Sequence, residues 1–552
     1  MVRAGRPPLA GRPAPVRLPG VRRLHAGPLP LAEIPLPRPG PAQGPAPRRL
    51  GRAPRRRAVL RPAQPAGTRR DRVRPQGLRG RLSSSSGPSG SRPARPPTYR
   101  ARVIKGFKGR LLTPGDADYD DHRRIWNEAV QTRPALLARC AGTDDVALAI
   151  GHAHDNGLPL TVRAGGHNFA GRSLADGGVV IDVRDLTGIA VDPGRRVARL
   201  GAGLRWGRVD PVLQRHGLAT TGGSVSKVGV AGFSLGTGLG WLGRLHGLAG
   251  DNLTGATIVT ADGAVRDVGP HADPDLYWAL RGAGTGLGVV TEFRMRLFPV
   301  VRPATGMLVH RLEDAHNVLW QAVEATADAP SHLNWAAVLT CAPPIPALPD
   351  DVQGRPVFLV PVFSTGPDGA DDPHVQALRR IGRPLLDTIA PTDFCAFQTS
   401  TDDAAPDGTH WDVRSEWLTR LDGPAIDHAA AMIEEASSPL SEFLFRPLGG
   451  AISAPDAPDT PFSYRHAAFM TEVIANWPDG DGAAERAWAE KGLAGVLHLS
   501  AGGPDINHLG LDEDPARARA AYSPATRARL AGIKKTYDPG NAFTSPPWLA
   551  PL

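Results

Sequence analysis

The chain has 552 residues, 41% of them hydrophobic, which predicts two or more packed domains. Its formal net charge of +10 is unevenly distributed, because residues 1–100 hold 23 arginines and only two acidic residues and so carry +21, which leaves −11 for the remainder. The folded part is therefore acidic, and we expect no specific nucleic-acid partner. No run of 18 apolar residues occurs, so we predict neither a transmembrane helix nor a membrane partner.

Residues 1–103 form a basic leader, rich in arginine, proline, alanine and glycine, with little apolar periodicity. Such a segment cannot bury enough apolar surface to offset the entropy of ordering, so we expect it to be disordered. It has no apolar run of signal-peptide length, although a basic arm could contact nucleic acid or anionic lipid. Because the next methionine after Met1 is Met295, and arginine alone supplies the charge, we interpret the leader as a mis-assigned start in GC-rich coding sequence and expect order from about Ile104.

The cysteine content points to a reducing compartment. Only three cysteines occur, and their wide, odd spacing fits neither a zinc site nor a disulfide framework; they are Cys140, Cys341 and Cys395. We therefore expect buried thiols, no bound metal and a cytoplasmic location.

Alternating helices and strands are expected to open the ordered chain. Val146, Ile150 and Ala153 share one helical face, which predicts a helix over residues 144–156. The segment "LPLTVR" then predicts a strand, and "VRAGGHNFAG" follows at once, with two glycines before His167. Further strands are predicted over residues 177–183 and 196–203, and a helix over residues 206–217.

Residues 220–247 are unusually rich in glycine. Ordering such a segment has a high entropic cost unless a ligand requires close approach of the backbone. Loops around Gly165, Gly229 and Gly284 each follow an apolar segment and expose backbone amides. This pattern favours a large phosphate-bearing ligand that contacts several turns.

The rest of the chain reads as a hairpin, a helix–loop–strand unit and a second domain. Residues 254–268 predict two strands joined at Asp262 and Gly263. A helix, a glycine loop and a strand follow, ending near Val300. From about residue 302 to residue 500, proline-rich loops separate strand-like runs such as "RPVFLVPVFS" from helices such as "PAIDHAAAMIEEA". The last stretch predicts helices before a Pro-Gly-Asn turn.

Two short motifs suggest other classes of protein. "GFSLG" matches the nucleophile elbow of serine hydrolases at Ser234, with Asp505 and His508 following in the required order, but "SKVGVAG" is a poor preceding strand. A GxGxxG match is also preceded by a glycine-broken run, which argues against a Rossmann fold; its glycines are Gly238, Gly240 and Gly243. Neither the phosphate-binding motif G-x-x-x-x-G-K-[ST] of nucleoside triphosphatases nor the metal-binding motif HExxH occurs.

His167 ends its glycine run, and its imidazole could fill space, bind a metal, act as a base or be bonded to a ligand. No Cys/His cluster supports a metal. Because the histidine is expected to face the same ligand as the glycines, a covalent bond to an electrophilic cofactor carbon is one of its possible roles.

The chain resembles the FAD-binding domain of the vanillyl-alcohol oxidase / p-cresol methylhydroxylase (PCMH-type) superfamily, and within it the berberine-bridge-enzyme-like FAD-linked oxidases of bacteria. The stretches that carry the resemblance span nearly everything from about Ile104 to Phe543. They include "LPLTVRAGGHNFAGRSLADGGVVIDV", "GLATTGGSVSKVGVAGFSLGTGLGWLGRLHGLAGDNL", "DPDLYWALRGAGTGLGVVTEF" and "YDPGNAF".

The resemblance implies FAD, held by an R-x-G-G-H loop whose histidine is often bonded to the 8α-methyl carbon of the flavin. Arg163, Gly165, Gly166 and His167 match that loop. Some members add a second link from a cysteine, but Val225 stands at that place, so one covalent link is predicted. The other cofactor-binding residues implied are Asn168, Ser224, Val228, Gly229, Gly232, Gly236, Gly238, Asn252 and Val290.

The catalytic side departs from the family pattern. The family's "GG-x-Y-x-N" tyrosine, which can serve as a base, is replaced in "GGPDINH" by Asp505, while Asn507 is kept. A carboxylate could accept a proton if burial raises its pKa, although an exposed loop aspartate is the alternative. Tyr464 and Tyr522 are further candidate proton acceptors, or else packing residues of a sheet and a helix. The family's "GGGGNFG" is "GAGTGLG" here.

These observations predict an α+β fold: a two-subdomain PCMH-type FAD-binding domain over residues 104–302, a substrate-binding domain with a mainly antiparallel sheet backed by helices over residues 303–508, and a C-terminal segment, residues 509–552, that returns to the FAD domain. The predicted function is an FAD-dependent oxidase. It would pass a hydride from an alcohol or activated C–H of a sugar or secondary metabolite to flavin N5, with O2 or another molecule as electron acceptor. A serine hydrolase at Ser234 and a catalytically inactive FAD-binding protein are the alternatives.

Overall fold

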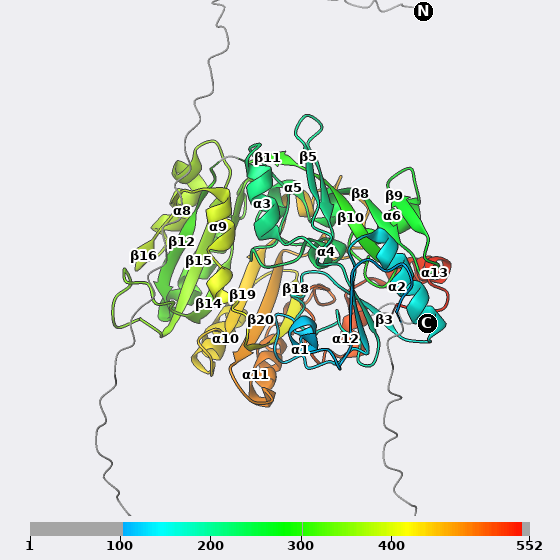
Figure 1. The fold of residues 1–552 in the computed structure, drawn as a ribbon. Coiled ribbons are helices and arrows are strands. Elements are labelled where there is room, and N and C mark those ends of the chain that lie inside the picture. Colours follow the sequence, from blue (N-terminus) through cyan, green and yellow to red (C-terminus); the bar gives the residue numbers. More distant parts are fainter. Residues whose placement is uncertain (1–102, 301, 544–552) are drawn as a thin grey trace, which may run out of the picture. The chain divides into compact units, whose positions relative to one another are not determined.

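The computed structural model describes residues 103–300 and 302–543, and in these the chain forms helices and sheets as an α+β fold (Figure 1). The prediction of a disordered leader falls outside the described residues, apart from Val103. Among the described helices, none is long and apolar enough to cross a membrane.

The first sheet is mostly parallel. Its order is β1-β2-β4-β3, where β2, β4 and β3 run parallel and β1 pairs antiparallel with β2. The predicted helix and strands are present here. Asp144 and Asp145 lie in the first turn of the helix, where negative charge interacts favourably with the helix dipole. Val146 and Ile150 are buried against the sheet. The elements are β1 (Arg110–Leu112), α1 (Tyr119–Arg123), β2 (Leu136–Arg139), α2 (Thr143–Asp155), β3 (Leu160–Arg163) and β4 (Val179–Asp182).

A second, antiparallel sheet shares its core with the first. Its order is β5-β6-β10-β8-β9, and the predicted turn between β8 and β9 is present, with Gly263 at φ +76°. The strands are β5 (Ile189–Asp192), β6 (Val197–Gly201), β8 (Leu253–Val259), β9 (Val265–Val268) and β10 (Val289–Arg296), with a separate pair of β7 (Leu218–Ala219) and β11 (Phe298–Pro299). The helices of this part are α3 (Trp206–Gln214), α4 (Val230–Leu235), α5 (Gly243–His246), the 3-10 turn η1 (Gly250–Asn252) and α6 (Pro274–Leu280).

From Ala304 onward the chain builds a larger antiparallel sheet with the order β16-β12-β15-β14-β19-β20-β18. The strands are β12 (Ala304–Arg311), β13 (Leu333–Trp335), β14 (Ala337–Cys341), β15 (Pro356–Ser364), β16 (Leu386–Asp387), β17 (Ala390–Pro391), β18 (His410–Leu418), β19 (Glu442–Pro447) and β20 (Phe469–Trp477). The helices are α7 (Ala315–Ala325), α8 (Pro373–Arg380), α9 (Phe394–Thr399), α10 (Gly423–Glu434) and α11 (Ala483–Ala494), with 3-10 turns η2 (Leu312–Asp314), η3 (Gly369–Asp371), η4 (Asp402–Ala404), η5 (Gly450–Ile452) and η6 (Leu497–Leu499).

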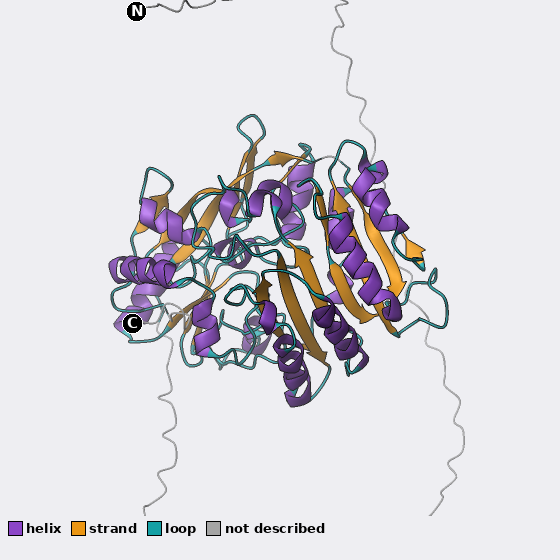
Figure 2. Ribbon diagram, turned by 180° about the vertical axis from the view of Figure 1, so that it is seen from behind, coloured by secondary structure: helices purple, strands orange, loops and turns teal. Residues whose placement is uncertain are grey.

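The two faces of this sheet differ because side chains alternate along a strand. On one face, Phe443, Phe445 and Val473 pack in a single apolar core with helices α7, α8, α10 and α11, which cover the sheet (Figure 2). On the other face, the intervening residues Leu444 and Glu472 line a cavity. The predicted antiparallel sheet backed by helices is thus confirmed.

The C-terminal helices α12 (Pro515–Ala520) and α13 (Pro524–Tyr537) contact the N-terminal part of the chain. Lys534 Nζ donates a hydrogen bond to Gly286 O (2.7 Å), and the backbone N–H of Leu160 donates to Ala542 O (3.1 Å). The guanidinium of Arg529 stacks on the Trp278 ring of α6 at 3.9 Å. These contacts bring the end of the described chain alongside strand β3.

Candidate active site

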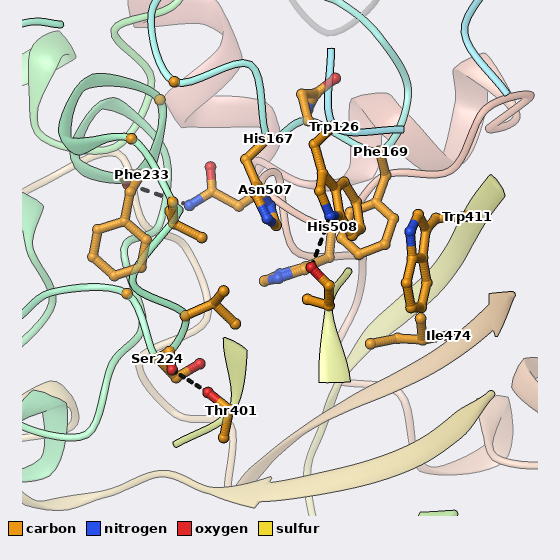
Figure 3. Close-up of a pocket in the computed structure, with 18 of the residues that line it drawn as sticks. Trp126, His167, Phe169, Ser224, Phe233, Thr401, Trp411, Ile474, Asn507 and His508 are labelled. Carbon is orange, nitrogen blue, oxygen red and sulfur yellow. Dashed lines mark hydrogen bonds between the residues drawn. The ribbon is translucent and has the colours of Figure 1, made fainter. Parts of the chain in front are cut away.

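A cavity of about 1410 Å³ is bounded by glycine loops on one side and by the open face of the large sheet on the other. Figure 3 shows His167 beside Trp126 on one wall, with Asn507 and His508 close by. The cofactor-binding residues predicted from the sequence that line it are Gly165, Gly166, His167, Asn168, Ser224, Val228, Gly229, Gly232, Gly236 and Val290.

Two loops of this wall meet so closely that only glycine fits. A Cβ atom added at Gly165 would lie 2.6 Å from Gly229 Cα, and one added at Gly229 would lie 2.7 Å from Gly165 Cα. Arg205 holds this junction from the side, because its guanidinium donates a hydrogen bond to Gly165 O (2.9 Å). The wall therefore presents backbone instead of side chains, which suits a ligand with a diphosphate.

His167 lines the cavity and is held by an aromatic stack. Its ring lies 4.1 Å from the Trp126 ring at an interplanar angle of 14°, and Trp126 stacks in turn on Trp411. Burial, with a smaller contribution from Arg205, lowers the pKa of His167 to about 4, so the imidazole is neutral. Its Nε2 atom has no hydrogen-bond partner among the described residues. An orphaned, neutral nitrogen beside a glycine-lined wall fits a covalently held flavin.

Three other predicted cofactor-binding residues lie behind the wall and do not line the cavity. The buried Arg163 guanidinium donates hydrogen bonds to the carbonyl oxygens of His122 and Arg124. Asn252 Nδ2 donates to Leu248 O at 3.1 Å, and Gly238 has a left-handed φ of +70°. These residues fix the shape of the loops.

A charged network lies at the other side of the cavity. His508 Nε2 is 2.9 Å from Glu472 Oε1, and His508 Nδ1 is 2.7 Å from Asp505 Oδ2. Arg446 Nε donates to Glu472 Oε2 at 2.9 Å. Burial opposes charge on the imidazole, but the two carboxylates outweigh it and raise the pKa of His508 to about 10. Likewise burial opposes ionisation of Glu472, but His508 and Arg446 lower its pKa to about 2. His508 and Glu472 are therefore both ionised at neutral pH.

The three predicted proton acceptors do not line the cavity. Asp505 is buried and accepts hydrogen bonds from the Thr237 hydroxyl and from the backbone N–H of Asn507; it contacts the cavity-lining residue His508 at Nδ1. Tyr522 donates its hydroxyl to Gly282 O at 2.7 Å, and Tyr464 donates to Ala520 O. Burial raises the pKa of Tyr464 to about 12 and raises that of Tyr522 further. Both hydroxyl groups therefore donate hydrogen bonds to backbone carbonyls and stay protonated at neutral pH.

Sequence reasoning missed Glu472 and Arg446 and assigned His508 only to a hydrolase. The available signal was a single charged residue, a glutamate, in the mostly apolar strand "FMTEVIANW". The serine-hydrolase alternative is not favoured: Ser234 is buried in α4, outside the cavity lining, and its Oγ has no hydrogen-bond partner in the described part of the chain. Within the described ranges, no group of His, Cys, Asp or Glu could hold a metal ion.

Comparison with known proteins shows the family of this chain. An FAD binding domain family model matches residues 134–269. The chain is 30% identical over 455 residues to (R)-6-hydroxynicotine oxidase of Paenarthrobacter nicotinovorans, covering 79% of this chain and 95% of that protein. The crystal structure of 6-hydroxy-D-nicotine oxidase from Arthrobacter nicotinovorans aligns with a TM-score of 0.72 at 27% identity, covering 81% and 98% of the two chains.

A more distant structure has the same fold: xylooligosaccharide oxidase from Myceliophthora thermophila aligns with a TM-score of 0.70 at 21% identity, covering 81% of this chain and 98% of that one. The predicted fold, cofactor and enzyme class are thereby confirmed. The chain belongs to the FAD-linked oxidases of the vanillyl-alcohol oxidase / PCMH superfamily, and it is an FAD-dependent oxidoreductase that acts on a small-molecule substrate.

Proposed function

We propose that this oxidase holds FAD through a single covalent bond between His167 and the 8α-methyl carbon of the flavin. The observation that carries the proposal is the neutral, unpartnered Nε2 of His167 at a glycine-walled cavity, where no described residue bonds to it. A neutral imidazole has a free lone pair, as a nucleophile requires. Val225 also lines the cavity and has no thiol, so one link is proposed and not two.

The backbone of the glycine loops would bind the cofactor's diphosphate. We assign this role to the cavity-lining residues Gly165, Gly166, Asn168, Ser224, Val228, Gly229, Gly232, Gly236 and Val290. Arg163, Gly238 and Asn252 would act from behind by fixing the loops.

When bound, FAD accepts the hydride, and the side chains of this protein position the substrate and hold charge. The His508 imidazolium places a positive charge beside the cavity, where it stabilises negative charge that develops during the reaction. Asp505 is a positioning residue in this scheme, because it orients His508 through Nδ1. Tyr464 and Tyr522 would support the loops around the site instead of accepting a proton.

The substrate would be an alcohol or a molecule with an activated C–H bond, from the sugars or secondary metabolites. O2 is the proposed electron acceptor, with hydrogen peroxide as product, because the named relatives are oxidases. The free thiols of Cys140, Cys341 and Cys395 support the predicted location in a reducing compartment.

The test is the fate of the yellow colour on denaturation. The purified protein should be yellow, and acid precipitation should leave the flavin in the pellet. His167→Ala should release the flavin into the supernatant while the protein stays folded. A colourless protein after incubation with excess FAD, or release of all flavin from the unaltered protein, would overturn the proposal.

A further inference from the structure

The open face of the large sheet is mostly apolar where it lines the cavity. Residues of the six strands β12, β14, β15, β18, β19 and β20 line the cavity, and the apolar ones include Met307, Val338, Leu359, Leu444 and Ile474. Three charged side chains stand among them: Glu442 and Arg446 on β19, and Glu472 on β20. Whether each of these side chains has an ion-pair partner within the protein determines which ligand charge this face can bind.

Two of these three charges are already compensated within the protein. Arg446 Nε pairs with Glu472 Oε2, and Glu472 Oε1 pairs with His508 Nε2, each at 2.9 Å. The other ring nitrogen of His508, Nδ1, lies 2.7 Å from Asp505 Oδ2, so a second carboxylate contacts the imidazolium. Two cations and two carboxylates therefore balance without Glu442.

Glu442 is the exception on this face. It is only partly buried and lines the cavity, yet it makes no hydrogen bond or ion pair with any residue in the described ranges. Its neighbours toward the cavity are Leu444 on its own strand and Ile474, its register partner on β20. An ionised carboxylate in apolar surroundings is costly unless a counter-charge meets it. Among the charged residues of this sheet face, Glu442 is thus the one whose carboxyl group meets no counter-charge from the described residues.

We propose that the substrate of this oxidase is an organic cation, an amine-bearing molecule with an apolar body, whose cationic group binds against Glu442. The apolar side chains around the carboxyl group contact the hydrocarbon part of the ligand. A neutral sugar would leave Glu442 without a counter-charge and would bring many hydroxyl groups against an apolar wall. The inference rests on the proposed oxidase site and specifies its substrate class.

A pair of probes of the same shape separates charge from fit. Phenyltrimethylammonium is a permanent cation, and tert-butylbenzene is its neutral counterpart. Binding of each to the FAD-loaded protein is followed by the change in the flavin absorbance spectrum. We expect the cation to bind at least about tenfold more tightly than the neutral probe, as is typical of a charge-assisted contact.

Glu442→Gln should reduce this ratio to about one by weakening cation binding alone. The matched control is Glu434→Gln, which removes the same charge from the exposed end of α10 and should leave the ratio unchanged. Equal binding of both probes to the unaltered protein, or a cation preference that survives in Glu442→Gln, would overturn the inference. The probe comparison on the unaltered protein decides the matter even if the variant fails to fold.

Failure of this inference and failure of the oxidase proposal give different results. A protein that retains acid-stable flavin but binds both probes equally contradicts only the cationic substrate. A protein that binds no flavin contradicts the proposed function itself.

Discussion

The imidazole of His167 lies nearly parallel to the indole of Trp126, with the ring centroids 4.1 Å apart. Trp126 is itself held in place, because its Nε1 donates a hydrogen bond to Ala405 O at 3.1 Å and its other contacts include the stacked ring of Trp411. The tryptophan therefore restricts the rotation of the imidazole and directs its nitrogen atoms. In the proposed function, this arrangement would hold the imidazole in place for bond formation with FAD.

Trp126→Leu should slow covalent attachment of FAD, since an aromatic pair contributes about 0.5–1.5 kcal/mol, equivalent to a rate change of up to about tenfold. Trp126→Phe should restore most of the rate because it keeps an aromatic face. The measurement is the growth of acid-stable flavin after FAD is added to apoprotein. Trp320→Leu is the control, because that tryptophan is exposed on α7. An unchanged rate in Trp126→Leu would show that the stack does not orient His167.

Gly229→Ala should lower both FAD content and the free energy of unfolding, because the new Cβ would lie 2.7 Å from Gly165 Cα and the loops must separate. Overpacking of this kind costs about 1–3 kcal/mol. Urea unfolding and the ratio of flavin to protein measure the two effects. Gly151→Ala is the matched control, since a Cβ there meets nothing within 4 Å. Full FAD content in Gly229→Ala would contradict a backbone-lined diphosphate site.

The glycine wall of the cavity was predictable because its requirements are local in the sequence. A backbone-lined wall needs glycine, so Gly165, Gly229 and their neighbours appear as runs that can be read directly. His167 follows its glycines at once, and its position needed no knowledge of the fold.

The charged side of the cavity was not predictable, because sheet topology assembles it from distant segments. Glu472 lies in the middle of β20 and His508 follows in a C-terminal loop, and only the folded chain brings them within 2.9 Å. Sequence comparison directed attention to Asp505, whereas the imidazole three residues later lines the cavity. Tyr464 and Tyr522 were candidates for chemistry, but each hydroxyl is used by a backbone carbonyl, which a sequence does not show.

Tyr522→Phe should lower the free energy of unfolding by about 1–3 kcal/mol, because Gly282 O loses its donor in a buried place. The rate of flavin reduction by substrate should stay within about twofold, since the hydroxyl does not line the cavity. Urea unfolding and stopped-flow absorbance measure the two quantities. A large fall in the reduction rate with unchanged stability would instead make Tyr522 a catalytic residue.

Glu472→Gln should cost about 3–5 kcal/mol of stability near neutral pH, because it breaks a buried ion pair and leaves His508 with one carboxylate fewer. The raised pKa of His508 also gives a pH signature. The stabilisation is complete below its ordinary pKa of 6.5 and is lost as the pH rises toward about 10. The unaltered protein should therefore lose stability over this window, and Glu472→Gln should lose less. Parallel curves for the two proteins would contradict the assigned charge of His508.

The affinity for a cationic ligand should rise with pH around neutrality. Burial raises the pKa of Glu442 to about 7, with Glu472 adding to the rise and Arg446 opposing it. Below that pH the carboxyl group is protonated and uncharged, so phenyltrimethylammonium should bind weakly, and above it the carboxylate should bind tightly.

The neighbouring charged groups leave this signal to Glu442. The pKa of Glu472 is lowered to about 2, that of His508 is raised to about 10, and burial raises the pKa of Cys341 above its ordinary value. Arg446 carries a guanidinium, a group that stays protonated in proteins. None of these groups changes its charge near pH 7. Flavin absorbance titrations across this range should show the rise for the unaltered protein and for Glu434→Gln, and a flat profile for Glu442→Gln. A rise that persists in Glu442→Gln would assign the titration to a different group.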